Sequence, residues 1–357
     1  MREIRHALLR WYRANKRDLP WRRTDDSYRI WVSEVMLTQT RVETVVPYYE
    51  RFLKAFPDVR ALARAPEARV LKQWEGLGYY ARVRHLRAAA REVLSRYGGS
   101  LPRSAAGLRS LPGFGPYTSA AVASIAFDEA VAVFDGNVRR VMSRLFLSHD
   151  GLAALAQSLL DPKNPCDCNQ AVMELGALVC LPRRPKCPLC PLRVHCRALA
   201  AGQIARYPAH MAHRKPLLVH SVAIVLWRRS KVLVVPRPRR GRYGGLWEFP
   251  TFEASTFSSA FRSARRAFGD LNLGFVPTRR PPPGFFDHHL SHRTIRMRVF
   301  KVRSQGETGP KTGRWVSPGR LETLPLSRLQ QRVRDAALCN RKPRSCPVAG
   351  GKPGWIP

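Results

Sequence analysis

The sequence predicts two structural classes in one chain, a mainly helical first domain followed by an α+β second domain. Three observations lead to this prediction. Up to residue 198, apolar residues recur at spacings of three and four, which is the period of an amphipathic helix. From residue 219, the pattern changes to alternating or consecutive β-branched residues, which are typical of strands. Between the two patterns, residues 199–217 are polar, basic and interrupted by two prolines, as expected of a linker.

In the first domain, residues 1–198, short connections that contain glycine or proline separate the predicted helices. The helical spacing is found at residues 28–41, 59–75, 81–97, 116–127, 136–147 and 169–180. In the second domain, residues 218–340, strands are predicted for the stretches VHSVAIVLW, KVLVVPR and TIRMRVFKV. Residues 341–357 are rich in proline, glycine and basic side chains, and we expect a mobile tail there.

The composition indicates a polyanionic partner. The 357 residues carry a formal net charge of +37 at pH 7, and such a surface favours nucleic acid because neutralised phosphates release their counterions. A general preference for arginine in the source proteome would give the same composition, so charge alone leaves that alternative open. The sequence shows no run of about 18 apolar residues and no signal peptide. We therefore expect a cytoplasmic protein, nucleoid-associated if bacterial, with no membrane partner.

Four cysteines are concentrated near the end of the first domain, with the spacing Cys180-x6-Cys187-x2-Cys190-x5-Cys196. Four thiolates at this density can hold one compact metal centre, and both tetrahedral zinc and a [4Fe-4S] cluster accept four cysteines. The spacing alone leaves zinc open. The other cysteines match no ligand pattern and are interpreted as ordinary thiols, with a second site as the alternative: Cys166, Cys168, Cys339 and Cys346.

A glycine-containing turn lies at residues 111–122, LPGFGPYTSAAV. Gly113 and Gly115 allow a tight turn, and a helix is predicted to start near Pro116. Backbone N–H groups exposed at such a turn can bind a phosphate. A plain connection between two helices would have the same sequence, so the turn alone does not decide between the two.

Two carboxylates stand out as candidates for acid–base chemistry. Asp135 directly precedes a predicted helix, where its ordinary role would be that of an N-cap. Glu34 lies beside the apolar stripe of the segment 28–41. It is either a solvated helix residue or an acid in a half-apolar pocket, where desolvation keeps the carboxyl group protonated near neutral pH.

Together, the cysteine loop after ELGALVC, the LPGFGPYTSAAV turn and the segment SEVMLTQT resemble the endonuclease III and MutY family of base-excision DNA glycosylases. The resemblance continues in family order through most of the first domain. It implies a helix-hairpin-helix motif at residues 111–122 and an iron–sulfur loop at residues 180–196. In this family the four cysteines of the loop hold a [4Fe-4S] cluster, so the resemblance favours the cluster over zinc.

The resemblance also implies roles for individual residues. Glu34 would protonate N7 of adenine and later activate water, and Asp135 would stabilise the oxocarbenium-like sugar, in line with two-carboxylate glycosidase chemistry. Tyr117 would lie beside the sugar and Asn137 would order the site. The implied adenine pocket consists of Trp21, Arg22 and Gln170, and the implied DNA contacts are Gln39, Gly113, Gly115 and Tyr79, which would wedge into the duplex.

Two features separate the chain from the sister endonuclease III enzymes. Tyr117 stands where those enzymes carry the lysine that forms a Schiff base and cleaves the strand, so a monofunctional enzyme is implied. The second domain resembles the Nudix-like domain of the MutY branch, most clearly at RYGGLWEFPTFE. The helix FRSARRAFGD lacks the glutamates that a working Nudix hydrolase needs for Mg²⁺, so we expect no pyrophosphatase activity.

The sequence HLSH at residues 289–292 resembles the family loop that recognises 8-oxoguanine, through His289, Ser291 and His292. Leu290 replaces the usual phenylalanine, and a polar hairpin turn remains the alternative interpretation. A second departure is Thr38, which replaces the first glutamine of the family's VMLQQT segment. The sequence does not determine how these two departures affect lesion preference.

The resemblance therefore implies a monomeric, monofunctional adenine DNA glycosylase with a [4Fe-4S] cluster, acting in base excision repair. Its expected substrate is double-stranded DNA with adenine opposite 8-oxoguanine or guanine. Two alternatives remain at this stage. One is a bifunctional glycosylase and lyase, and the other is a non-catalytic iron–sulfur protein that binds DNA.

Overall fold

The computed structural model describes residues 1–209, 216–268, 285–290, 292–303 and 312–338. The chain forms two compact units. The first contains Met1–Ala65 and Arg82–Ala212, and the second contains Pro66–Ala81 and His213–Ile356. This division does not test the predicted boundaries at residues 198 and 218, which stay a prediction. The predicted tail and part of the predicted linker lie outside the described residues.

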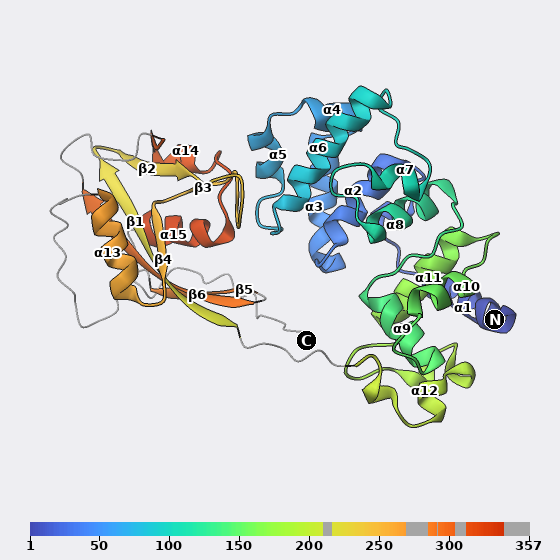
Figure 1. The fold of residues 1–357 in the computed structure, drawn as a ribbon. Coiled ribbons are helices and arrows are strands. Elements are labelled where there is room, and N and C mark those ends of the chain that lie inside the picture. The colour runs from blue at the N-terminus through green and yellow to red at the C-terminus, as the bar shows by residue number, and fades with distance from the viewer. Residues whose placement is uncertain (210–215, 269–284, 291, 304–311, 339–357) are drawn as a thin grey trace. The chain divides into compact units, whose positions relative to one another are not determined.

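The first unit is helical (Figure 1). Its α-helices are α1 (Arg2–Asn15), α2 (Ser27–Leu37), α3 (Val42–Ala55), α4 (Val59–Arg64), α6 (Ala81–Arg96), α7 (Ala105–Arg109), α8 (Pro116–Phe127), α9 (Gly136–Phe146), α10 (Leu152–Leu159), α11 (Pro165–Leu178) and α12 (Arg197–Ala200). Short 3-10 helices complete it: η1 (Pro20–Arg22), η2 (Cys187–Leu189), η3 (Arg193–His195) and η4 (Ile204–Arg206).

Local sequence explains where several of these helices begin and end. Asp26 caps α2 by accepting hydrogen bonds from Tyr28 N and Arg29 N. The single helix predicted over residues 59–75 is wrong, because the chain forms two helices there, α4 and α5 (Glu67–Gln73). Pro66 causes the break, since proline disfavours a helical conformation in the preceding residue, and Ala65 has ψ 140°.

The helices that form the functional site pack around a common core. Helix α11 packs on α1, α8 and α9, and α2 packs on α8. Buried side chains from α1, α9, α10 and α11 form one cluster that includes Leu8, Met142, Leu159 and Leu175. This packing brings the ends of α2, α8, α9 and α11 together although they are far apart in the sequence.

The second unit contains a mixed sheet with the strand order β3-β2-β1-β6-β5, while β4 pairs with β1 and β7 with β2. The strands are β1 (Leu217–Arg228), β2 (Lys231–Pro236), β3 (Trp247–Glu248), β4 (Thr251–Ala254), β5 (Phe286–Leu290), β6 (Arg293–Arg303) and β7 (Arg314–Val316). Strands β1 and β6 are parallel, with Leu217 opposite Arg293. The helices are α5, α13 (Phe257–Phe268), α14 (Pro318–Leu321) and α15 (Arg328–Leu338).

Both faces of this sheet are covered, which explains the continuous apolar sequence of its central strand. Ala223 and Val225 of β1 pack in a cluster with Val333 of α15. Ile224 of the same strand packs in a second cluster with Ala264 of α13. Alternate residues of β1 therefore face opposite layers, and the predicted change from helices to strands is confirmed.

Residues 66–81 pack with the second unit by several specific contacts. Leu326 N donates a 2.7 Å hydrogen bond to Glu75 Oε1, and Lys72 Nζ donates a 3.2 Å bond to Leu324 O. The rings of Tyr80 and Tyr243 meet edge to face at 6.3 Å. Among the described residues, no helix is long and apolar enough to cross a membrane.

Candidate active site

A cavity of about 180 Å³ in the first unit is lined by side chains from η1, α2, α8 and α11 and from the start of α9. The sequence analysis assigned residues on all of these elements to the reaction. The cavity brings together every predicted catalytic and adenine-pocket residue: Trp21, Arg22, Glu34, Tyr117, Asp135, Asn137 and Gln170. The cavity therefore combines a buried carboxylic acid, a second carboxylate and several hydrogen-bonding side chains.

Glu34 lies on α2 and is almost completely buried, with 4% of its surface exposed. Burial raises the pKa of Glu34 to about 7, and the negative charge of Asp135 acts in the same direction. The hydrogen bond from Tyr117 and the positive charge of Arg22 oppose this shift. A carboxyl group with this pKa is protonated in a substantial fraction at neutral pH, as a general acid requires.

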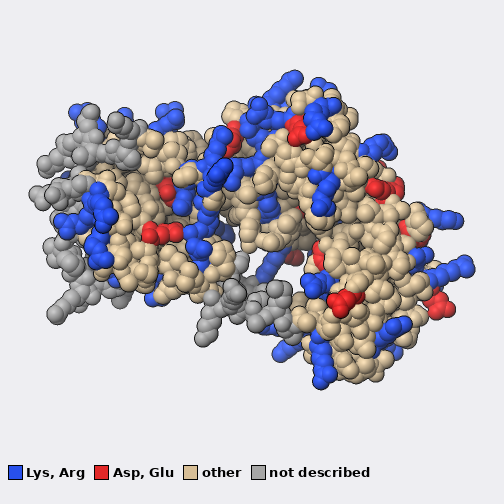
Figure 2. All heavy atoms as spheres, viewed as in Figure 1, with Lys and Arg blue, Asp and Glu red and all other residues tan. Residues whose placement is uncertain are grey.

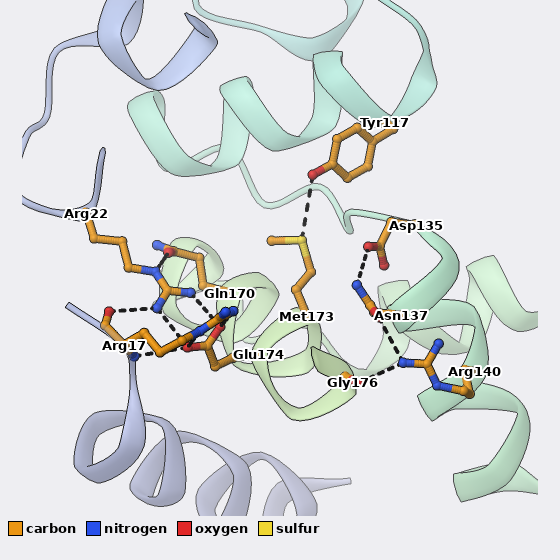
Figure 3. Close-up of polar contacts among 10 residues, drawn as sticks. All are labelled: Arg17, Arg22, Tyr117, Asp135, Asn137, Arg140, Gln170, Met173, Glu174 and Gly176. Carbon is orange, nitrogen blue, oxygen red and sulfur yellow. Dashed lines mark hydrogen bonds and ion pairs between the residues drawn. The ribbon is translucent and has the colours of Figure 1, made fainter. Parts of the chain in front are cut away.

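Tyr117, in the first turn of α8, donates a 2.6 Å hydrogen bond from its hydroxyl to Glu34 Oε2. The hydroxyl also lies 4.0 Å from Met173 Sδ on α11 (Figure 3). Burial, together with the adjacent Glu34, raises the pKa of Tyr117 well above its ordinary value. The phenol therefore keeps its proton and orients the Glu34 carboxyl group.

Asp135 combines its ordinary helix-capping role with a place in the cavity. Its Oδ1 accepts a 2.7 Å bond from Val138 N and so caps α9. Its Oδ2 accepts a 3.0 Å bond from Asn137 Nδ2 (Figure 3). Because both oxygens are held, the carboxylate has a defined orientation toward the cavity that it lines.

Arg140 connects this pair to the cysteine loop, and the sequence analysis missed it. Its Nη2 donates to Asn137 Oδ1 at 2.8 Å and to Gly176 O at 2.7 Å (Figure 3). Its Nε donates to Cys180 O at 2.7 Å. Nothing in the run NVRRVMSR distinguishes Arg140, which is 9% exposed, from its exposed neighbour Arg139. Only the packing of α9 against α11 reveals its position.

The sequence analysis also missed Arg17 and Glu174, which form an ionic network with Arg22 (Figure 3). Glu174, on α11, is 2% exposed and accepts hydrogen bonds from both guanidinium groups. Arg22 Nε in turn donates a 2.9 Å bond to Gln170 Oε1. Two members of the predicted adenine pocket are therefore joined, and Glu174 supports them.

The predicted glycine turn has the expected geometry. Gly113 has φ +81°, and a Cβ there would lie 2.5 Å from His85 Cβ, so only glycine fits without a shift. Gly115 is the N-cap of α8 and is followed by Pro116 at the first helical position. Open space surrounds the position of a Gly115 Cβ, so this helix start is accessible to a ligand.

The predicted DNA-contact residues lie on exposed turns. Gln39 has a left-handed φ of 58° and is exposed, directly after α2. Arg82 holds this turn, since its Nη1 donates to Met36 O at 2.9 Å and its Nη2 donates to Thr40 Oγ1 at 3.1 Å. Tyr79 has φ 49° and is 50% exposed. Because it belongs to residues 66–81, its loop is part of the second unit.

The four cysteines of the loop at residues 180–196 are free thiols and partly buried. Burial raises the pKa of Cys190 to about 11, and the other three thiols of the loop act in the same direction. Arg144 Nη1 donates a 3.3 Å bond to Cys180 Sγ. Within the described ranges, no group of three or more His, Cys, Asp or Glu side chains has the spacing of a metal site. The donor set itself, four thiols beside a buried cation, suits an anionic thiolate cluster.

The predicted lesion loop is only partly described. His289, on β5, is exposed, and its Nδ1 lies 3.1 Å from Thr294 Oγ1. His292 is exposed and its carbonyl accepts a bond from Leu217 N, whereas Ser291 lies outside the described residues. The neighbouring His288 was missed by the sequence analysis. Burial lowers its pKa to about 4, so its imidazole is neutral at pH 7.

Basic side chains are spread over the surface of both units and outnumber acidic ones on the face shown (Figure 2). Some of the arginines are engaged within the protein. Arg296, for example, forms two 2.9 Å hydrogen bonds with Asp287. The excess of positive charge is nevertheless the surface that the sequence analysis expected for a protein that binds nucleic acid.

Comparison with protein families gives two matches. Residues 32–162 match the HhH-GPD superfamily of base excision DNA repair proteins, and residues 221–336 match the NUDIX domain. Among solved structures, a thermostable thymine-DNA glycosylase is 31% identical with a TM-score of 0.53, covering 56% of this chain and 95% of that chain. An endonuclease III–DNA complex, at 20% identity, has a TM-score of 0.50 over 56% of this chain and 97% of that chain. The predicted fold class is confirmed.

Similarity to curated proteins extends over both units. Adenine DNA glycosylase of Homo sapiens is 36% identical, over 92% of this chain and 73% of that protein. The Rattus norvegicus enzyme is 34% identical, over 92% of this chain and 77% of that protein. The Arabidopsis thaliana enzyme is 36% identical, over 93% and 64% respectively. The predicted enzyme class, DNA N-glycosylase, is confirmed, and the chain belongs to the adenine DNA glycosylase family of base excision repair enzymes.

Proposed function

We propose that this protein is a monofunctional glycosylase that removes adenine opposite 8-oxoguanine, and opposite guanine, in double-stranded DNA. One observation carries the proposal. The buried acid Glu34 and the oriented carboxylate Asp135 line the same cavity, together with the side chains of the predicted adenine pocket. An N-glycosidic bond breaks when the leaving base is protonated and the positive charge on the sugar is stabilised.

In the proposed reaction, an adenine turned out of the duplex enters the cavity, and Glu34 donates its proton to N7 of the base. The bond between N9 and the sugar then breaks, and its electrons remain on the base. Asp135, held by Asn137 and by the start of α9, stabilises the oxocarbenium-like sugar. Glu34, now ionised, accepts a proton from the water that attacks the sugar carbon, which restores the acid.

The absence of strand cleavage is proposed from the chemistry of Tyr117. A lyase of this family type needs an amine that forms a Schiff base with the sugar. Tyr117 offers a phenol with a raised pKa, and its hydroxyl is already committed to Glu34. We therefore expect no covalent adduct when borohydride is added to a reaction with adenine-containing duplex. A trapped adduct would instead favour the alternative, a bifunctional glycosylase and lyase.

We also propose that a [4Fe-4S] cluster is held by Cys180, Cys187, Cys190 and Cys196. Bound there, the cluster would supply a rigid anchor for the basic loop, and the residues of this chain would carry out the reaction. Purified under anaerobic conditions, the protein should contain about four iron atoms per chain and absorb broadly near ~400 nm. Cys187→Ala should lose the iron, and Cys166→Ser should keep it. Stoichiometric zinc would contradict the proposal.

For lesion recognition, we propose His289, Ser291 and His292 of the second unit. The proposal is supported by the exposure of His289, near the end of β5, and of His292, directly before β6. Replacing His292 by alanine should reduce excision opposite 8-oxoguanine more than excision opposite guanine, because only the former pair carries the lesion.

We further propose that the protein acts as a monomer.

The central test is single-turnover excision from duplexes with adenine opposite 8-oxoguanine, guanine, cytosine and thymine. We expect the fastest release opposite 8-oxoguanine, slower release opposite guanine and little release in the other two. Glu34→Gln should slow adenine release by about 10²–10⁴-fold, while Glu92→Gln, which changes a carboxylate on α6, should not. Unchanged release by Glu34→Gln would contradict the mechanism. DNA binding without release by the wild-type protein would support a non-catalytic iron–sulfur protein.

A further inference from the structure

The cavity contains a carboxylate that the proposed reaction does not use. Glu174 is 2% exposed and accepts five hydrogen bonds. Three come from Arg17, through its backbone N, Nε and Nη2 at 3.0, 2.9 and 2.7 Å. Two come from Arg22, through Nη1 and Nη2, both at 3.0 Å. Although burial raises its pKa, the bonds from Arg17 and Arg22 outweigh burial and lower the pKa of Glu174 to about 2. Glu174 is therefore a permanent anion.

This anion fixes the position of the Arg22 guanidinium. Two parallel bonds to one carboxylate define the plane of the group, and Nη1 donates a third bond to Arg17 O at 3.0 Å. With its two terminal nitrogens held in this way, the guanidinium directs its remaining nitrogen, Nε, at Gln170 Oε1 at 2.9 Å (Figure 3). Arg22 is thus locked between two residues that lie one helical turn apart on α11.

The locked guanidinium determines which way the Gln170 carboxamide points. The oxygen and nitrogen of a carboxamide have nearly the same shape, so an unconstrained glutamine can turn either way. A guanidinium only donates, so the oxygen of Gln170 must face Arg22. The amide nitrogen then faces the other way, where Nε2 donates to Cys166 Sγ at 3.2 Å. Gln170 therefore presents a fixed order of acceptor and donor to the cavity that it lines.

A fixed carboxamide can distinguish adenine from its deaminated form. On the Watson–Crick edge of a flipped adenine, a glutamine can accept from the 6-amino group and donate to N1, which leaves N7 free for Glu34. Hypoxanthine has the same shape, but a carbonyl replaces the amino group and N1 carries a hydrogen. The order of donor and acceptor is therefore reversed. A carboxamide that could turn over would fit both bases, whereas a locked one fits adenine alone.

We propose that Glu174 is a positioning residue for base specificity, which holds the Gln170 carboxamide through Arg22 in the orientation that pairs with adenine. This inference rests on the proposed function, because it concerns the base that enters the same cavity. Glu174 touches neither the base nor the sugar in this role. Its effect is on the ratio of two substrates and not on the cleavage chemistry, since both bases leave from N9 and both offer N7 for protonation.

The test compares single-turnover release of adenine and of hypoxanthine, each placed opposite 8-oxoguanine. The wild-type protein should prefer adenine by on the order of 10- to 100-fold, the range expected of one well-formed bidentate contact to a base. Glu174→Gln keeps the shape but removes the charge, and it should reduce the preference to within a few-fold. The matched control is Asp167→Asn, which removes a carboxylate from the same helix, paired with Arg13. It should keep the wild-type ratio.

A double-mutant cycle separates positioning from a general loss of structure. If Glu174 acts through Gln170, then Glu174→Gln should leave the ratio unchanged in a Gln170→Met background. If Glu174→Gln does not fold, Arg22→Lys can be used, because it removes the bidentate contact between Arg22 and Glu174. It should give the same loss of preference. An unchanged ratio in the single variant, or an equal change in both backgrounds, would overturn the inference. If the wild-type protein released both bases at equal rates, the inference about Glu174 would fail while the proposed function would stand. If it released no adenine, both would fail.

Discussion

Tyr117 Oη lies 2.6 Å from Glu34 Oε2 and donates a hydrogen bond to it, joining α8 to the buried acid on α2. This bond lowers the pKa of Glu34 against the larger effect of burial. The pKa of Glu34 is therefore modulated by Tyr117, a residue far from it in the sequence. Several consequences of this geometry can be measured.

The first prediction concerns Tyr117→Phe. Removing the hydroxyl removes the bond that lowers the pKa of Glu34, so this pKa should rise above about 7. Because the protonated form is the active acid, the alkaline limb of the pH–rate profile for adenine release should move to higher pH. Tyr28→Phe is the control. Tyr28 lies on α2, the helix that carries Glu34, but its hydroxyl donates to Phe56 O. A limb that stayed in place or moved to lower pH would contradict the assignment of Glu34 as the acid.

The second prediction concerns the stability cost of the buried acid. Burial raises the pKa of Glu34 from 4.5 to about 7 in the folded protein. Below pH 4.5 both folded and unfolded chains are protonated there, and nothing is lost. As the pH rises from 4.5 to about 7, the unfolded chain ionises at this position and the folded chain does not, so stability falls by up to about 3 kcal/mol and stays at the lower value above pH 7. Glu34→Gln should therefore be more stable than wild type above pH 7, and the difference should shrink below pH 4.5. Denaturant unfolding at the two pH values measures this, and an equal difference at both would contradict it.

The third prediction concerns Arg140→Met. The substitution keeps the apolar stem but removes the donor from three acceptors, the buried Gly176 O and the partly buried Asn137 Oδ1 and Cys180 O. We expect a loss of about 3 kcal/mol in the free energy of unfolding, together with slower adenine release because Asn137 is no longer held. Arg139→Met, at the exposed neighbouring position, should change stability by less than about 0.5 kcal/mol. If the two substitutions lowered the free energy of unfolding equally, the hydrogen bonds of Arg140 would not contribute to stability.

The fourth prediction concerns the close approach of α11 to α9 at Gly176. A Cβ at this position would lie 2.6 Å from Asn137 Cβ and 3.1 Å from its Cα. Gly176→Ala should therefore displace Asn137 and destabilise the protein by about 1–3 kcal/mol. Gly136→Ala, at the first residue of α9, meets no atom within 4 Å and should be neutral. Thermal unfolding of both variants and the rate of adenine release by Gly176→Ala provide the measurement.

Much of the site could be predicted from the sequence because its motifs are local. The cysteine spacing, the glycine turn and the acid before α9 are each fixed by a few neighbouring residues, and a resemblance can be read from them. Pro66 shows the limit of periodicity, since the apolar spacing continues through residues 59–75 while the backbone does not. Arg17, Arg140 and Glu174 were missed for another reason. A charged residue looks the same in sequence whether it is solvated or buried in a network.

The sequence by itself determined the family, the order of helices and strands and several of the residues that line the cavity. It left open whether Glu34 is solvated or buried, and a helical period cannot decide this. Tertiary structure decided it, because the desolvation that raises the pKa of Glu34 comes from elements far along the chain, which pack around α2. The orientation of Gln170 was decided in the same way, by Arg22 and Glu174 on different elements. Protonation and hydrogen-bond direction depend on the groups within a few ångströms, and folding alone determines which groups those are.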